Sequence, residues 1–242
     1  MQIQQTQFQD QLVRGLAHRM NNILTLFHGY VGLMLENNSL DKGTREGLNK
    51  IRDGATAATE LMDRAHSLVR PSALVWREID VAEFLMMLRH VFDGFCRPNT
   101  KLEVICPSEL PPVWADASRV KTAIVELVRN ACEASCEKGG SVRIHASVEA
   151  GAGKLNATPT SALQPLKWVV ISITDNGPGI DADMEEKIFQ PFFSTKKRQN
   201  AAGLGLTVAS GVIQQLGGIL RFDSRPGRTC FQVLLPARTE PR

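Results

Sequence analysis

The chain has 242 residues, of which 43% are hydrophobic, so it is long enough for one ordinary domain or two small ones with a normal core. Its net charge of +3 is too small to indicate a nucleic-acid-binding protein, and no apolar run approaches the ~20 residues that a membrane span needs. The five cysteines form no CxxC pattern and are odd in number, which predicts reduced thiols in a cytoplasmic protein rather than disulfides or a zinc site.

Residues 1–70 follow helical spacing, because apolar residues recur in alternating steps of three and four. The first run consists of Val13, Leu16, Met20, Ile23, Phe27, Tyr30 and Met34. The second run consists of Leu48, Ile51, Ala55, Ala58, Met62, Ala65 and Val69. The segment between them, ENNSLDKGT, is typical of a turn, so we expect an antiparallel helical hairpin.

The apolar stripe of the first helix is wider than a two-helix seam needs, since it also contains Leu12, Leu24, Val31 and Leu35. One hairpin cannot cover such a stripe. We therefore expect two chains to pair their hairpins as a four-helix-bundle homodimer.

Pro71 ends the second helix, and the pattern then changes. Short β-type runs occur at KLEVIC, SVRIHASV, WVVISIT and CFQVLL, with helical stretches near 80–92, 116–138 and 204–216. This alternation predicts an α/β layer over residues 71–242, in which helices cover a sheet. The whole chain is then α+β, with a helical hairpin domain at 1–70 and a sandwich domain at 71–242.

His18 lies on the first predicted helix in LAHRMNNIL. If Leu16 and Met20 are core positions, His18 is farthest from the seam, because helical residues advance ~100° each. A solvated surface histidine is the simplest alternative to a functional one. Asn22 lies one turn on, and the same face contains small residues that leave room for a docked partner: Gly15, Thr25 and Gly29.

Two glycine motifs in the second half indicate a nucleotide site. WVVISITDNGPGI is a strand that leads into Asp175, Gly177 and Gly179, where a carboxylate can accept from an exocyclic amine and glycines permit close backbone approach. AAGLGLTVASGV places Gly203 and Gly205 just before a helix, whose N-terminal amides suit phosphate.

A third motif, VELVRNACEA, places Glu126 and Asn130 four residues apart on one helix face. Both offer oxygens, which suits a Mg²⁺ ion that keeps several waters. A plain turn, a helix start and a solvated face explain each motif singly, but not all three in this order.

With these motifs in place, the chain resembles the catalytic core of bacterial sensor histidine kinases, in the GHKL (Bergerat-fold) ATPase superfamily. GLAHRMNNIL matches the phosphoacceptor H box, ELVRNACEA the N box and DNGPGI the G1 box. FQPFFSTK matches the F box, AGLGLTV the G2 box and GGILRFDSRPGRTCFQVLLP the last hairpin. The segment PFFSTK is similar to the nitrogen-regulator subgroup.

The resemblance implies an ATP–Mg²⁺ site. Asp175 would bind the adenine amine and Thr229 would line the same pocket, while Asn130 and Glu126 would hold magnesium. Glu126 stands where many of these kinases have asparagine and where ATP-hydrolysing relatives have a water-orienting glutamate. Lys196 would reach the γ-phosphate. The phosphates and the lid would be framed by Gly177, Gly179, Gly203, Leu204 and Gly205. The lid would be anchored by Phe189 and Phe192.

The resemblance also implies that His18 accepts a phosphoryl group and passes it to an aspartate of a response-regulator receiver domain. Arg19 departs from the family pattern, which usually has an acidic residue directly after the histidine. Such a carboxylate makes the imidazole a better nucleophile, whereas an arginine cannot accept a proton. Asn22 matches the position that orients water in relatives that dephosphorylate the receiver.

We therefore predict a dimeric two-component histidine kinase core that autophosphorylates His18. Three alternatives stay open: a kinase-weak phosphatase or phosphotransfer hub, a nucleotide-binding scaffold without activity, and a serine kinase of the mitochondrial dehydrogenase-kinase type. The His18 face argues against the last. The chain contains no sensor domain, so the input comes either from the rest of a longer protein or from a separate sensor protein.

Overall fold

The structure is a computed structural model that describes residues 2–68, 73–107, 109–135, 139–151, 167–194 and 203–238, without the side chains of 2–14, 16–18 and 66–68. The chain divides into two compact units. One unit contains residues 1–71 with the segment 194–204, and the other contains residues 72–193 with 205–242. None of the described helices contains an apolar stretch long enough to cross a membrane.

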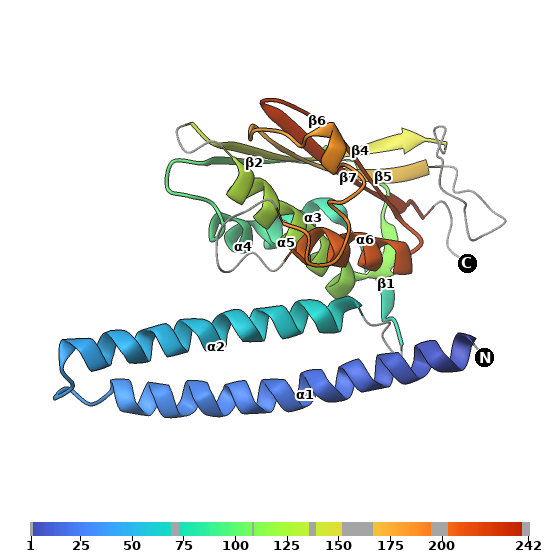
Figure 1. The fold of residues 1–242 in the computed structure, drawn as a ribbon. Helices are drawn as coiled ribbons and strands as arrows, with labels where there is room; N and C mark the ends of the chain where they lie inside the picture. The colour runs from blue at the N-terminus through green and yellow to red at the C-terminus, as the bar shows by residue number, and fades with distance from the viewer. Residues whose placement is uncertain are drawn as a thin grey trace. The chain divides into compact units, whose positions relative to one another are not determined.

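The first unit is an antiparallel hairpin of two helices, α1 (Gln2–Leu35) and α2 (Lys42–Leu68) (Figure 1). Side-chain hydrogen bonds at the end of α1 and at the start of α2 hold the turn between them. Arg45 Nη1 donates to the carbonyl of Leu35 at the end of α1 (3.1 Å), which satisfies an acceptor without an intrahelical partner. Asp41 caps α2, because its Oδ1 accepts from the amide of Thr44 at 2.9 Å.

The hairpin packs through a different stripe of α1 from the one that the heptad spacing predicts. Leu24 and Val31 of α1 are buried, with exposed fractions of only 7% and 5%, and Ala55 of α2 is buried as well. Five predicted seam residues of α1 are exposed, namely Met20, Ile23, Phe27, Tyr30 and Met34, while the side chains of Val13 and Leu16 lie outside the described residues. The expected seam is therefore wrong for the contact within one hairpin. The reason is that spacing shows which residues form an apolar stripe but not which neighbour covers each edge of it.

The second unit is an α/β sandwich that contains two sheets. The five strands of the main sheet are β2 (Lys101–Ile105), β4 (Ser141–Ala150), β5 (Lys167–Asp175), β7 (Arg228–Pro236) and β6 (Ile219–Arg225), in that spatial order. β2 pairs with β4 in parallel, and the other neighbours are antiparallel. A separate antiparallel pair is formed by β1 (Trp76–Ile79) and β3 (Val113–Asp116).

Helices cover one face of the main sheet (Figure 1). They are α3 (Val81–Met87), α4 (Arg89–Asp93), α5 (Ala117–Ala134) and α6 (Gly205–Gln215), and a short 3₁₀ turn, η1, spans Ala182–Met184. The covered face follows the two-residue period of the strands, since Val142, Ile144 and Ala146 of β4 are all fully buried.

The α+β fold class, with a helical hairpin followed by an α/β sandwich, is confirmed. All four strands that the sequence predicts are present in the main sheet. The single helix expected near residues 80–92 is instead two short helices that meet at Leu88, the C-cap of α3 and N-cap of α4. Strands β1 and β3 are not predicted, because each has only four residues and no alternating pattern.

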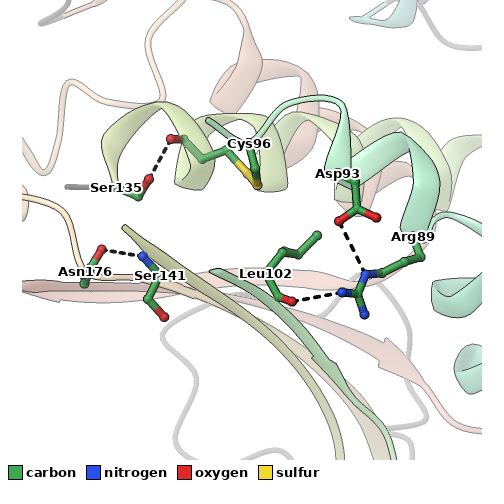
Figure 2. Close-up of a disulfide and its surroundings, with 8 residues drawn as sticks. Arg89, Asp93, Cys96, Leu102, Ser135, Ser141 and Asn176 are labelled. Carbon is green, nitrogen blue, oxygen red and sulfur yellow. Dashed lines mark hydrogen bonds and ion pairs between the residues drawn. A yellow bond between two sulfur atoms is a disulfide. The ribbon is translucent and has the colours of Figure 1, made fainter. Parts of the chain in front are cut away.

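Cys96 and Cys132 form a disulfide, with Cα atoms 5.0 Å apart (Figure 2). The prediction that all thiols are reduced is therefore wrong for this pair. The two residues are 36 positions apart and become neighbours only because the turn after α4 packs against α5. Among the other cysteines that the structure describes, Cys106 and Cys230 are free.

Asp116 caps α5 and joins it to the start of β1. Its Oδ1 accepts from the amide of Ser118 (2.9 Å), and its Oδ2 accepts from the amide of Val75 (2.9 Å). Burial raises the pKa of the Asp116 carboxyl, but hydrogen bonds from Ser118 and from the amides of Val75 and Arg119 outweigh it and hold the pKa below 3.8. The ionised side chain is therefore the form that the fold stabilises.

We expect Asp116→Ala to lower the free energy of unfolding by ~1–2 kcal/mol at neutral pH, as measured by urea denaturation. Because the folded pKa is depressed, this contribution is present above the unfolded pKa and is lost as the pH falls through the folded value. The difference from wild type should therefore shrink in acid. Asp181→Ala is the matched control, since Asp181 precedes η1 without a side-chain cap bond and should change stability by less than ~0.5 kcal/mol. Equal losses in the two variants would contradict the capping role.

Candidate nucleotide-binding site

Helix α5 brings two of the predicted site residues to the start of α6. Glu126 and Asn130 are one helical turn apart, and the Glu126 side chain is only 6% exposed. A Cβ atom on Gly205 would lie 2.9 Å from Glu126 Oε2 and 3.3 Å from Asn130 Nδ2. The carboxylate and the amide therefore lie against the backbone of the second glycine motif, where a larger residue would require these side chains to shift.

The same stripe of α5 continues to the first glycine motif. Ala134 is one further turn along from Asn130, and a Cβ atom on Gly177 would lie 2.5 Å from the Ala134 carbonyl oxygen. Gly177 is also held from the other side, because its amide donates to Asp175 Oδ1 at 2.8 Å. One face of α5 thus links the N-box side chains to the loop that follows β5.

Asp175 ends β5 and is buried, with an exposed fraction of 5%. Its register partner on β7 is Thr229, which is also buried. Thr229 Oγ1 lies 3.0 Å from Ser224 Oγ, which in turn accepts from the amide of Ile180 at 2.9 Å. This polar chain fixes the G1 loop against the β6–β7 hairpin beside the buried carboxylate.

Gly179 closes the same loop with a positive φ of 90°. A Cβ atom there would lie 2.7 Å from the Arg225 carbonyl oxygen, so the position requires glycine for space as well as for its backbone angle. Gly203 also has a positive φ, of 63°, and Leu204 after it is buried. α6 then begins at Gly205 with its amides at the end of the second glycine motif.

The F-box phenylalanines differ in their surroundings. The ring of Phe189 packs edge-on against Phe222 at 5.8 Å, and its carbonyl accepts from Thr207 Oγ1 of α6 at 3.0 Å. Phe192 lies apart from this cluster, with 73% of its surface exposed and a positive φ of 66°. Phe189 is therefore the residue that ties this segment to the start of α6.

Two predicted site residues cannot be placed at the level of side chains. Lys196 lies outside the described residues, and so does the side chain of His18. On the same helix, Arg19 and Asn22 are exposed. Gly15 and Gly29 have open space around their Cβ positions.

The residues that the structure brings together fit a nucleotide with magnesium. Asp175 supplies a buried acceptor, Glu126 and Asn130 supply oxygens, and the glycine turn at the start of α6 supplies backbone amides for phosphate. A charged carboxylate as buried as Glu126 requires compensation, and Arg129 provides it with an Nη1–Oε1 distance of 3.4 Å.

Several residues that shape the site were not identified from the sequence. Arg129 was missed although it lies within the N box and three residues after Glu126, because the Phe95 ring, 4.8 Å from its guanidinium, belongs to a distant segment of the chain. Asn176 was missed as well. It joins the G1 loop to the start of β4, because its Oδ1 accepts from the amide of Ser141 at 2.9 Å (Figure 2). Its Nδ2 donates to the carbonyl of Gly139 at 2.9 Å. Its position directly after Asp175 at a strand end is the one local signal for such a turn.

Comparison with known proteins agrees with this geometry. Residues 115–239 match the family described as histidine kinase-, DNA gyrase B- and HSP90-like ATPases. The chain is 32% identical to the sensor kinase CckA of Brucella abortus, over 100% of this chain and 25% of that protein. It is also 32% identical to the sensory histidine kinase/phosphatase NtrB of Azospirillum brasilense, over 91% of this chain and 54% of that protein.

Solved structures show the same fold. Full-length ShkA in complex with AMPPNP matches 96% of this chain and 47% of that one, with a TM-score of 0.72 at 21% identity. The catalytic domain of histidine kinase ThkA matches 68% of this chain and 97% of that one, with a TM-score of 0.54 at 26% identity. The chain thus spans between a quarter and about half the length of the two curated relatives and of ShkA. The resemblance to histidine kinase catalytic cores is confirmed, and the chain belongs to the family of histidine kinase-, DNA gyrase B- and HSP90-like ATPases.

Proposed function

We propose that this chain is the ATP-binding and phosphotransfer core of a two-component histidine kinase, acting in the cytoplasm, where ATP is available. The observation that carries the proposal is the shared stripe of α5, on which Glu126 and Asn130 meet Gly205 while Ala134 meets Gly177. Residues from three sequence motifs converge there beside the buried Asp175. The kinase names of the relatives support the same activity.

In this proposal Asp175 accepts from the adenine amine, with Thr229 in the same pocket. Asn130 and Glu126 hold Mg²⁺, which neutralises phosphate charge when bound. The glycine turn formed by Gly203 and Gly205, together with Leu204, frames the phosphates and the lid, and Lys196 reaches the γ-phosphate. Phe189 anchors the lid through Phe222 and Thr207, with Phe192 as its outer residue.

The domain of residues 1–70 supplies the acceptor. A His18 ring nitrogen attacks the γ-phosphorus, the bond from that phosphorus to the bridging oxygen of ADP breaks, and the phosphoryl group is carried on the imidazole. A receiver-domain aspartate then takes the phosphoryl group from the histidine. Asn22, one turn from His18, orients the water that later hydrolyses the aspartyl phosphate.

Incubation with γ-labelled ATP and Mg²⁺ tests the proposal. We expect the protein to acquire label that is acid-labile and base-stable, as a phosphohistidine is, and that is absent from His18→Gln. Acid-stable label would instead indicate a hydroxyl acceptor and exclude the histidine kinase assignment. Acid-labile label that persists in His18→Gln would show that a residue other than His18 is the acceptor.

We further propose that two hairpins form a homodimer through the exposed apolar stripe of α1. The stripe contains Ile23, Leu26, Phe27, Tyr30, Leu33 and Met34, each of which is 47% to 65% exposed. Contiguous apolar surface of this kind is typical of an interface.

Sedimentation of the full chain should therefore show a dimer at micromolar concentration, and Phe27→Glu should shift it to monomer. Met87→Glu provides the matched control, because Met87 is similarly exposed, at 58%, but lies on α3. Dimers in all three samples would place the interface elsewhere.

The receiver domain is expected to dock on the face of α1 that contains Gly15, Thr25 and Gly29. Gly29→Trp should block phosphotransfer to, or dephosphorylation of, the receiver while ATP binding and His18 labelling stay at wild-type levels. The Cβ position of Gly29 is open, since nothing lies within 4 Å of it. Full phosphotransfer by Gly29→Trp would mean that the receiver uses another face.

A further inference from the structure

A three-residue segment after α4 holds a second stripe of α5, which adjoins the nucleotide-site stripe. The Phe95 ring lies under the Arg129 guanidinium, 4.8 Å from it, and Cys96 is bonded to Cys132. Arg97 Nη1 donates to the Ser135 carbonyl at 3.4 Å. Residues 95, 96 and 97 thus contact Arg129, Cys132 and the C-cap residue Ser135 of α5, each three residues after the last.

The middle contact is covalent, and it is close to the N box. Cys132 is two residues after Asn130, and its carbonyl accepts from Ser135 Oγ at 2.8 Å (Figure 2). The Cys132 side chain is fully buried, whereas Cys96 is partly exposed. Cys96 is therefore the more accessible of the two residues to a solution thiol or disulfide.

The first contact leads into the nucleotide site. Arg129 lies between the Phe95 ring on one side and the Glu126 carboxylate on the other. Glu126 Oε2 in turn lies against Gly205 at the second glycine motif. The position of Phe95, directly before Cys96, therefore bears on the charge that faces the nucleotide.

We propose that Cys96 and Cys132 are a redox modification site that controls nucleotide binding through Phe95, Arg129 and Glu126. The proposal rests on the proposed function only in taking the pocket beside α5 as the nucleotide site. The disulfide holds Phe95 on Arg129 and so keeps Glu126 in place. Reduction releases the segment from α5 and weakens nucleotide binding.

The oxidant is a small-molecule disulfide such as oxidised glutathione. The Cys96 thiolate attacks one glutathione sulfur, forming a mixed disulfide and releasing one reduced glutathione. The Cys132 thiolate then attacks the Cys96 sulfur, forming the protein disulfide and releasing the second glutathione. Two protein thiols lose two protons and two electrons, and one glutathione disulfide becomes two thiols. In a reducing compartment such disulfides are typically transient and redox-sensing.

The experiment equilibrates the full chain in reduced and oxidised glutathione at several ratios and measures AMPPNP affinity by calorimetry. Mass spectrometry of alkylated peptides reports the state of each cysteine in the same samples. We expect affinity to follow formation of the Cys96–Cys132 bond, with the reduced protein binding about five-fold or more weakly, as is typical of coupled sites.

Cys96→Ser should bind like the reduced protein at every ratio, while Cys106→Ser should respond like wild type. Phe95→Leu should still form the disulfide but lose most of the affinity difference, because the ring under Arg129 is gone. The inference is overturned if the bond does not form, if affinity is equal in both redox states, or if Cys96→Ser still responds. Absence of AMPPNP binding in both states would instead overturn the proposed function.

Discussion

Arg19→Glu increases the initial rate of His18 labelling by about 10²–10⁴-fold at saturating ATP, the range that general-base assistance typically contributes. Transfer of a phosphoryl group depends mostly on positioning and charge. The neighbouring carboxylate is the element that this chain lacks, and Arg19 is an exposed side chain at that position. A glutamate there can hydrogen-bond the far nitrogen of the imidazole and stabilise the positive charge that develops during attack.

Two further variants isolate the cause. Arg19→Gln removes the positive charge without supplying a carboxylate, so it should recover only a small part of the rate. His18→Gln should abolish labelling in either background. If Arg19→Glu is labelled no faster than wild type, Arg19 does not limit the rate of His18 labelling, and a carboxylate elsewhere already assists His18.

Asp175→Asn weakens ATP–Mg²⁺ binding by about ten- to a hundredfold, because hydrogen bonds to a charged group contribute roughly 1.5–3 kcal/mol. The amide keeps one oxygen, which can still accept from Gly177, as Oδ1 does at 2.8 Å in the structure. The other oxygen is replaced by an NH₂ group. This group and the adenine amine are both hydrogen-bond donors, so the bond between them is lost. The fold should be retained, since the exchange conserves shape.

Calorimetry with AMPPNP measures this loss, and the melting temperature should no longer rise on addition of nucleotide. Asp181→Asn is the control on the same loop, because its side chain makes no cap bond and it lies beyond Gly179. Unchanged affinity in Asp175→Asn would show that the buried carboxylate is not the adenine acceptor.

The local patterns predict the helical hairpin, α5, α6 and four strands of the main sheet, and they select the candidate site residues on these elements. Glu126 and Asn130 are four residues apart, so the period of a helix alone places them on one face. Asp175 and the glycines can be recognised because the end of a strand and the start of a helix each favour particular residue types. Cap and turn residues act on neighbours in the sequence, which is why a single chain contains that information.

Other features depend on contacts between distant segments. Heptad spacing on α1 identifies an apolar stripe, yet Leu24 and Val31 rather than Phe27 and Tyr30 are buried in the hairpin. The spacing does not show which edge of the stripe packs against α2. The bond between Cys96 and Cys132 and the contact of the Phe95 ring with Arg129 join residues that have no periodic relation. Such pairs form only once the turn after α4 packs on α5, and the free energy that fixes them comes from burial of the whole layer rather than from any local preference.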